Sequence, residues 1–190
     1  MNSPQQPYAA RLEIDYPEKL DRVTSAFRLI WVIPIAIVAS LLAGVLWGAT
    51  LLMIVFRQRY PRWWFDYARE LTRFQTRIGA YVGLLTDRYP STEDEQSVHL
   101  EIDYPDVERE LNRWLPLVKW LLVIPHYLVL IVLGFVALFA VIAAWFAILF
   151  TGRYPRALFD YVVGVTRWGL RVNAYAFLLV TDTYPPFRLD

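Results

Sequence analysis

The sequence lacks cysteine, which excludes disulfide frameworks, thiol nucleophiles and cysteine-ligated zinc or iron–sulfur sites. Charge is also scarce: 19% of the 190 residues are charged, against about 25% in a typical soluble domain. The 19 basic and 18 acidic residues nearly cancel, so we expect no nucleic-acid partner. Apolar residues make up 57%, above the usual range of about 45–50%, which indicates a membrane protein.

Recognisable catalytic sites are missing as well. The two histidines, His99 and His126, lie in different surroundings, whereas a tetrahedral zinc site needs about three or four ligands. The sequence contains no P-loop, no glycine-rich dinucleotide turn and no serine in a nucleophile elbow. We therefore predict a protein that is not an enzyme, with no catalytic residues, no metal and no cofactor.

Long apolar runs are what the sequence has in abundance. Residues 29–56 form a run of 28 without a charge, and residues 120–150 form a run of 31 in which His126 is the only ionisable group. Both exceed the roughly 18 apolar residues that mark a transmembrane candidate. We therefore expect an all-α integral membrane protein.

The two runs belong to a tandem duplication. The segment Leu12–Pro17 recurs 88 positions later as Leu100–Pro105, and Arg59–Arg62 recurs 94 positions later as Arg153–Arg156. Smaller matches continue to the end of each copy. The predicted organisation is an N-terminal tail over residues 1–11, repeat one over 12–90, an acidic linker over 91–99 and repeat two over 100–190.

Repeat two resembles the DUF4389 family of bacterial membrane proteins, a domain of unknown function. The similarity is strongest over Ile124–His126 and Trp145–Arg156, and it continues to Tyr184–Phe187. Repeat one departs from this pattern, because Ile35 stands where repeat two has His126. The resemblance implies a location in the bacterial inner membrane and no particular activity.

Length and charge favour a helical hairpin in each apolar run. A single helix through residues 120–150 would be roughly 46 Å long, against a hydrocarbon core of roughly 30 Å. Basic residues flank both ends of each run, which favours an even number of crossings with cytoplasmic flanks and termini. The expected turns lie at residues 40–44 and 133–135, with Arg28 and Lys119 near the membrane interface. A single tilted span per repeat and a re-entrant loop remain as alternatives.

The segments after the two runs, residues 63–85 and 157–180, have the polar stripe of interfacial amphipathic helices. One interpretation makes this stripe a cytoplasmic site for lipid headgroups, a protein partner or a second copy of the chain. The other makes it a set of local ion pairs and phosphate-level anchors. The candidate binding residues are Arg73, Arg77, Arg153, Arg156, Asp160, Arg167 and Arg171.

Two short segments near the repeat ends, residues 12–16 and 100–104, alternate apolar and polar side chains. This alternation is typical of a half-buried strand. We predict that the two strands pair with each other or with the extended tails near Tyr89 and Tyr184.

His126 is the candidate intramembrane polar site, because ionisable groups inside apolar runs usually have a function. The other interpretation is a neutral imidazole that satisfies the kink at Pro125.

Two functions follow from these features. The first is a non-catalytic membrane scaffold or accessory subunit, and the alternative is a small transporter or channel-like protein with His126 in its membrane pathway.

Overall fold

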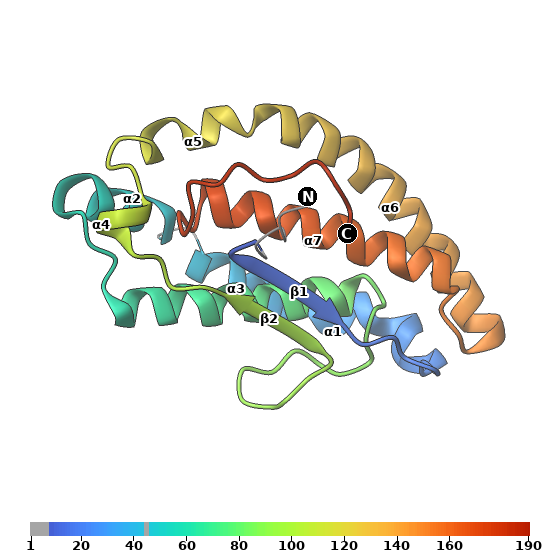
Figure 1. Cartoon of the computed structure of the whole chain (residues 1–190). Helices are drawn as coiled ribbons and strands as arrows, with labels where there is room; N and C mark the ends of the chain where they lie inside the picture. Colours follow the sequence, from blue (N-terminus) through green and yellow to red (C-terminus); the bar gives the residue numbers. More distant parts are fainter. Residues whose placement is uncertain (1–7, 44–45) are drawn as a thin grey trace, which may run out of the picture.

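The computed structural model describes residues 8–43 and 46–190, and most of these residues are helical (Figure 1). The predicted amphipathic helices are confirmed as α3 and α7, which end three and four residues earlier than expected. The elements are β1 (Ala10–Ile14), α1 (Arg22–Ala43), α2 (Leu46–Arg57), α3 (Arg62–Val82), β2 (Val98–Ile102), α4 (Val107–Glu110), α5 (Pro116–Leu122), α6 (Ile124–Thr151) and α7 (Arg156–Ala176).

The two strands form an antiparallel ribbon, which is the first of the two predicted pairings. Leu12 pairs with Leu100, its equivalent in the duplication, and a pseudo-two-fold axis therefore passes between them. The inward-facing positions of both strands are apolar and buried. On the outer face Arg11 forms ion pairs with Glu101 and Asp103 at 3.1 and 2.8 Å.

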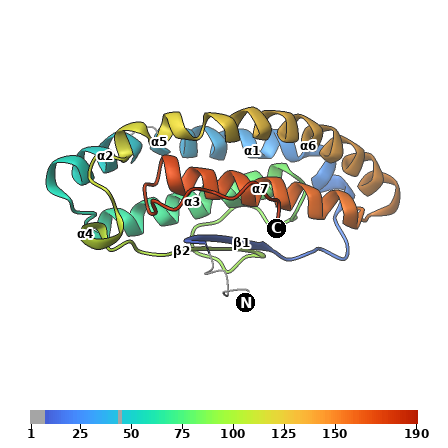
Figure 2. The same cartoon turned by 45° about the horizontal axis from the view of Figure 1, so that its top comes forward.

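The helices lie in two layers on this ribbon. Figure 2 shows α1, α2, α5 and α6 on one side of the molecule, α3 and α7 in the middle, and the ribbon on the other side. The contacts follow the same order, because α1 packs on α3, α6 packs on α7, and the two amphipathic helices contact β2 and β1. Each repeat therefore contributes one long apolar helical segment that is covered on its inner side by an amphipathic helix.

Proline and glycine set several helix ends. Pro61 and Pro155 immediately precede α3 and α7, and Pro125, which lacks an N–H, accompanies the break between α5 and α6. Gly152 ends α6 in the left-handed conformation with φ 72°, and its N–H donates to the carbonyl of Ile148 at 2.7 Å.

The predicted hairpin is wrong for repeat two, because α6 is one continuous helix over Ile124–Thr151. After Pro125 this segment contains no proline, so each backbone N–H can bond within the helix. Gly134 is accommodated in its interior at a modest cost in helix propensity. In repeat one, α1 continues through residues 40–43 of the expected turn, and Gly44 lies outside the described residues.

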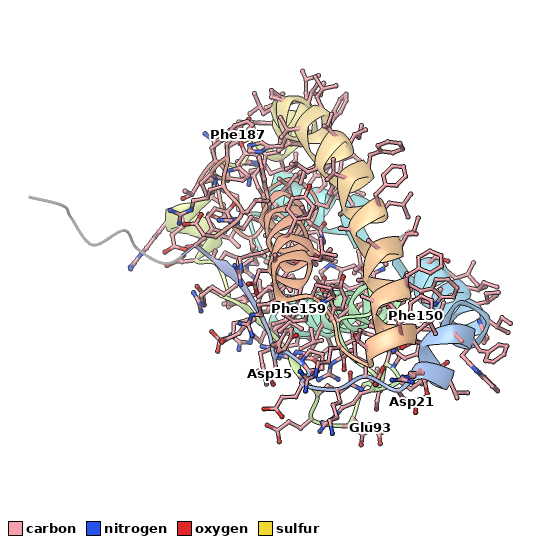
Figure 3. The ribbon with its side chains drawn as sticks, turned by 90° about the vertical axis from the view of Figure 1, so that its right-hand side faces the viewer. Asp15, Asp21, Glu93, Phe150, Phe159 and Phe187 are labelled. Atoms are coloured by element: carbon pink, nitrogen blue, oxygen red, sulfur yellow. The ribbon has the colours of Figure 1, made fainter. Side chains whose placement is uncertain are left out.

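Among the described residues, two stretches are long and apolar enough to cross a membrane, Ile30–Arg57 and Ile124–Thr151. Only 21% and 11% of their most apolar windows are buried inside the molecule, so both expose most of their surface. Figure 3 shows Phe150 on α6 beside α1, with Asp15 and Glu93 away from these helices.

We call the exposed apolar side chains of α1, α2 and α6 the apolar layer. Its members are Val23, Phe27, Ile30, Trp31, Ile33, Ile37, Val38, Leu41, Leu52, Phe56, Ile124, Leu128, Val129, Ile131, Val132, Phe135, Val136, Leu138, Phe139, Ile142, Phe146 and Phe150.

Candidate lipid- and partner-binding site

Two of the predicted binding arginines join the repeats to each other. Arg73 of α3 donates from Nη2 to the carbonyl of Leu100 in β2 at 3.2 Å. Arg167 of α7 donates from Nε to the carbonyl of Leu12 in β1 at 3.0 Å. Since each helix bonds to the strand of the other repeat, the two repeats are interlocked.

The next arginine on each helix is buried. Arg77 donates from Nη1 to the carbonyl of Ser91, and Arg171 donates from Nη2 to the carbonyl of Arg188 at 2.6 Å. Burial lowers the pKa of both Arg77 and Arg171 from the ordinary arginine value. The structure thus gives both arginines a role within the fold, while binding to a lipid or partner stays a prediction for them.

The remaining candidates lie at the start of α7 and are exposed. Arg156 pairs with Asp160 at 3.2 Å, and its guanidinium lies 4.5 Å from the centre of the Tyr16 ring. The equivalent Arg62 pairs with Asp66 at 3.4 Å in repeat one. Arg153 is exposed just beyond α6 and lines a pocket of about 480 Å³ with Lys19 and Arg22. These residues are therefore accessible to a ligand from outside.

A buried cation in each repeat was not expected from the sequence, which placed Arg28 and Lys119 near the membrane interface. Arg28 is fully buried, forms an ion pair with Asp87, and donates from Nη1 to the carbonyls of Tyr81 and Thr86, both at 2.9 Å. This correction follows from the packing of α1 on α3, which brings the carbonyls at the end of α3 to the start of α1.

Repeat two has the same arrangement with a lysine. Lys119 Nζ lies 2.7 Å from Asp182 Oδ1 and donates to the carbonyl of Thr181 at 2.6 Å. Its ammonium lies 4.8 Å from the centre of the Tyr175 ring, as the Arg28 guanidinium lies 4.5 Å from that of Tyr81. The duplication held the signal for both pairs, because each cation and each carboxylate has its equivalent in the other repeat.

His126 is fully buried beneath the C-terminal segment. Its Nδ1 accepts a hydrogen bond from Trp168 Nε1 at 3.0 Å, and its ring stacks on Phe187 with the ring centres 3.8 Å apart. Nε2 is buried without a hydrogen-bond partner among the described residues. The histidine therefore fixes α6 to α7 and to the C-terminal segment, and a role in transport stays a prediction.

Within residues 8–43 and 46–190, no group of three or more histidine or acidic side chains is placed to hold a metal ion.

Comparison with family models matched residues 22–92 and residues 114–188 separately to one family, described as a domain of unknown function, DUF4389. The matched segments include α1–α3 and α5–α7 and leave out both strands. Comparison with curated proteins and with solved structures gave no match.

Proposed function

The chain belongs to the DUF4389 family over both of its repeats, and from this premise we propose that it is a non-catalytic membrane scaffold. Its apolar layer is embedded in one face of the bacterial inner membrane, with the long helices in the membrane plane. The ribbon side faces the cytoplasm, where it is available to a protein partner or to a second copy of the chain.

The pairing of β1 with β2 carries this proposal. Hydrogen-bonded strands must lie on the same side of a membrane, and the chain between them passes once along α1 and α2 and once back along α3. If α1 and α2 crossed the bilayer, α3 would therefore have to cross back. A single crossing between the strands is incompatible with this ribbon.

The side chains of α3 disfavour such a return crossing. Asp66, Glu70 and Arg73 lie on this helix, and Arg69 and Arg73 pair with Glu70 at 3.1 and 2.6 Å near its surface. A charged side chain at the centre of the bilayer costs about 2.5–3.5 kcal/mol on insertion scales and more in simulations. An in-plane arrangement avoids this cost because it keeps α3 on the water side of α1.

Exposure of the apolar layer supports membrane contact. Phe150, Leu41 and Ile131 are 78%, 74% and 68% exposed, and such residues follow one another along α1 and α6. Soluble monomers rarely expose continuous apolar patches of more than a few hundred Å². The bilayer is the proposed cover of this face, because the opposite face has the ion pairs of Arg11 and the acidic residues of the linker.

The proposal is tested by finding on which side of the membrane each end of the α5–α6 segment lies. Single cysteines can replace Arg109 or Arg156, which flank these helices, because the natural chain contains no cysteine. We expect a membrane-impermeant maleimide to label neither variant in intact cells and both after the cells are opened. Cysteine at Glu101, on the outer face of the ribbon, is the matched control and should behave identically.

Labelling of one variant but not the other in intact cells would overturn the in-plane arrangement and favour a crossing by α6. Labelling of both variants in intact cells would overturn the cytoplasmic orientation. The multi-pass arrangement expected from the flanking charges requires a hairpin in each run, and the continuous α6 disfavours it.

A further inference from the structure

A pocket at the C-terminal end of α6 is lined by basic side chains and by no acidic ones. The pocket has a volume of about 480 Å³ and is lined by Lys19, Leu20, Arg22, Thr151, Gly152 and Arg153. Three of these residues are cations and none is acidic. Among the described residues, Lys19 and Arg153 form no ion pair, so their charges are not neutralised within the fold.

The helix terminus beside this pocket would ordinarily repel an anion, because the last carbonyls of a helix carry partial negative charge. Here donors of the protein already bind those carbonyls. Arg22 Nη2 donates to the carbonyl of Phe150 at 3.3 Å, and the Leu20 N–H donates to that of Gly152 at 3.0 Å. The Thr151 hydroxyl donates to the carbonyl of Ala147 at 2.7 Å. These bonds offset the partial negative charge of the helix end, beside which the pocket lining places three cations.

The pocket lies at the edge of the apolar layer. Phe150 and Val23, which are 78% and 68% exposed, adjoin Thr151 and Arg22 in the sequence. Figure 3 shows Phe150 and Asp21 at the same end of the molecule, where α6 ends and α1 begins. If the apolar layer is in the bilayer, the pocket lies at the level of the lipid phosphates.

We propose that this pocket binds the phosphate of an anionic phospholipid headgroup. The proposal rests on the proposed membrane location and assigns a lipid class to it. Lys19 and Arg153 supply the charge at its rim. Arg22 supplies a guanidinium fixed by its bond to Phe150, whose remaining N–H groups can form charge-assisted bonds with a phosphate oxygen.

The equivalent positions in repeat one provide an internal control. These positions are Glu110, Leu111, Arg113, Arg57, Gln58 and Arg59, so that Glu110 stands in place of Lys19 and Arg57 in place of Thr151. Glu110 precedes Leu111 as Lys19 precedes Leu20, and both leucines are buried. Glu110 places an acidic side chain among the three arginines of this end, so we expect weaker phosphate binding there than at the end of α6.

Vesicle binding of the full chain tests the proposal. Binding to vesicles of phosphatidylcholine alone is compared with binding to vesicles that also contain phosphatidylglycerol. The proteins are the natural chain and two double variants, Lys19→Gln with Arg153→Gln and Arg57→Gln with Arg59→Gln. The Arg57→Gln, Arg59→Gln variant measures general attraction and should lose about 30-fold of the preference for the anionic vesicles, because each basic residue near an anionic surface contributes about fivefold. The Lys19→Gln, Arg153→Gln variant should lose about tenfold more, because it also removes charge-assisted hydrogen bonds to the phosphate.

Equal losses in the two double variants would overturn the site and leave only general charge attraction. Inorganic phosphate that competes more strongly than sodium chloride of the same ionic strength would overturn the lipid assignment in favour of a free phosphate. Binding of the natural chain to phosphatidylcholine alone reports separately on the apolar layer. If the natural chain does not bind these vesicles, the proposed membrane location is wrong, and the headgroup site is wrong with it.

Discussion

Removing the carboxylate of Asp182 tests whether the buried cation of repeat two stabilises the fold. Asp182→Asn keeps an oxygen for the Asn112 N–H, which donates to Asp182 Oδ2 at 2.6 Å, but it leaves the buried Lys119 without its counter-ion. Removal of one partner from a buried pair costs about 3–5 kcal/mol. We expect about 3 kcal/mol, because 21% of the Asp182 side chain is exposed and the bond from Lys119 to Thr181 survives.

In a chain of this size, about 3 kcal/mol lowers the Tm by about 6–12 °C. The assay is thermal unfolding in mild detergent, followed by circular dichroism. Asp190→Asn is the control, because Asp190 is 82% exposed in its pair with Arg188 and such surface pairs contribute little. Lys119→Met combined with Asp182→Asn should regain most of the loss, since it removes the uncompensated charge. An effect of Asp182→Asn no larger than that of Asp190→Asn would refute the reasoning.

Three further changes have expected outcomes in the same unfolding assay. Arg167→Ala should lower the free energy of unfolding by about 1–2 kcal/mol because the Leu12 carbonyl loses its charged donor, and Arg167→Lys should lose less. Gly152→Ala should cost about 1–2 kcal/mol, because alanine is strained at φ 72°. Burial raises the pKa of Tyr60 to about 12, so stability should fall as the pH rises from about 10 to about 12, and Tyr60→Phe should flatten that fall. Between these pH values the unfolded chain has lost the phenol proton whereas the folded chain still holds it. Rising pH therefore favours the unfolded chain and lowers the free energy of unfolding. An unchanged alkaline slope in Tyr60→Phe would assign the fall to other groups.

Periodicity and repetition were sufficient to predict the two strands and the two amphipathic helices. The alternation around Leu12 and Leu100 predicted the paired strands, and the polar stripe containing Arg73 and Arg167 predicted α3 and α7. These signals are local, because the side-chain period of a helix or strand is set by the backbone geometry of that element alone. The duplication then placed one strand and one amphipathic helix in each half.

The partners of the charged side chains could not be predicted in the same way. Arg28 pairs with a carboxylate 59 positions away, and His126 accepts its hydrogen bond from an indole 42 positions away. Which groups meet at such separations depends on how helices pack, and no single-sequence period contains that information. The hairpin prediction failed in repeat two for a related reason, because length and flanking charge do not determine where a helix breaks.

Insertion depth along α6 tests the central claim, that the long helices lie in the membrane plane. Leu128, Phe139 and Phe150 are 11 residues apart, share one face of α6 and are 63%, 56% and 78% exposed. Single cysteines at these positions, labelled with an environment-sensitive fluorophore, are compared by depth-dependent quenching in vesicles. We expect similar depths for all three. A fluorophore at residue 139 that lies about 16 Å deeper than the other two, as a crossing helix requires, would contradict it.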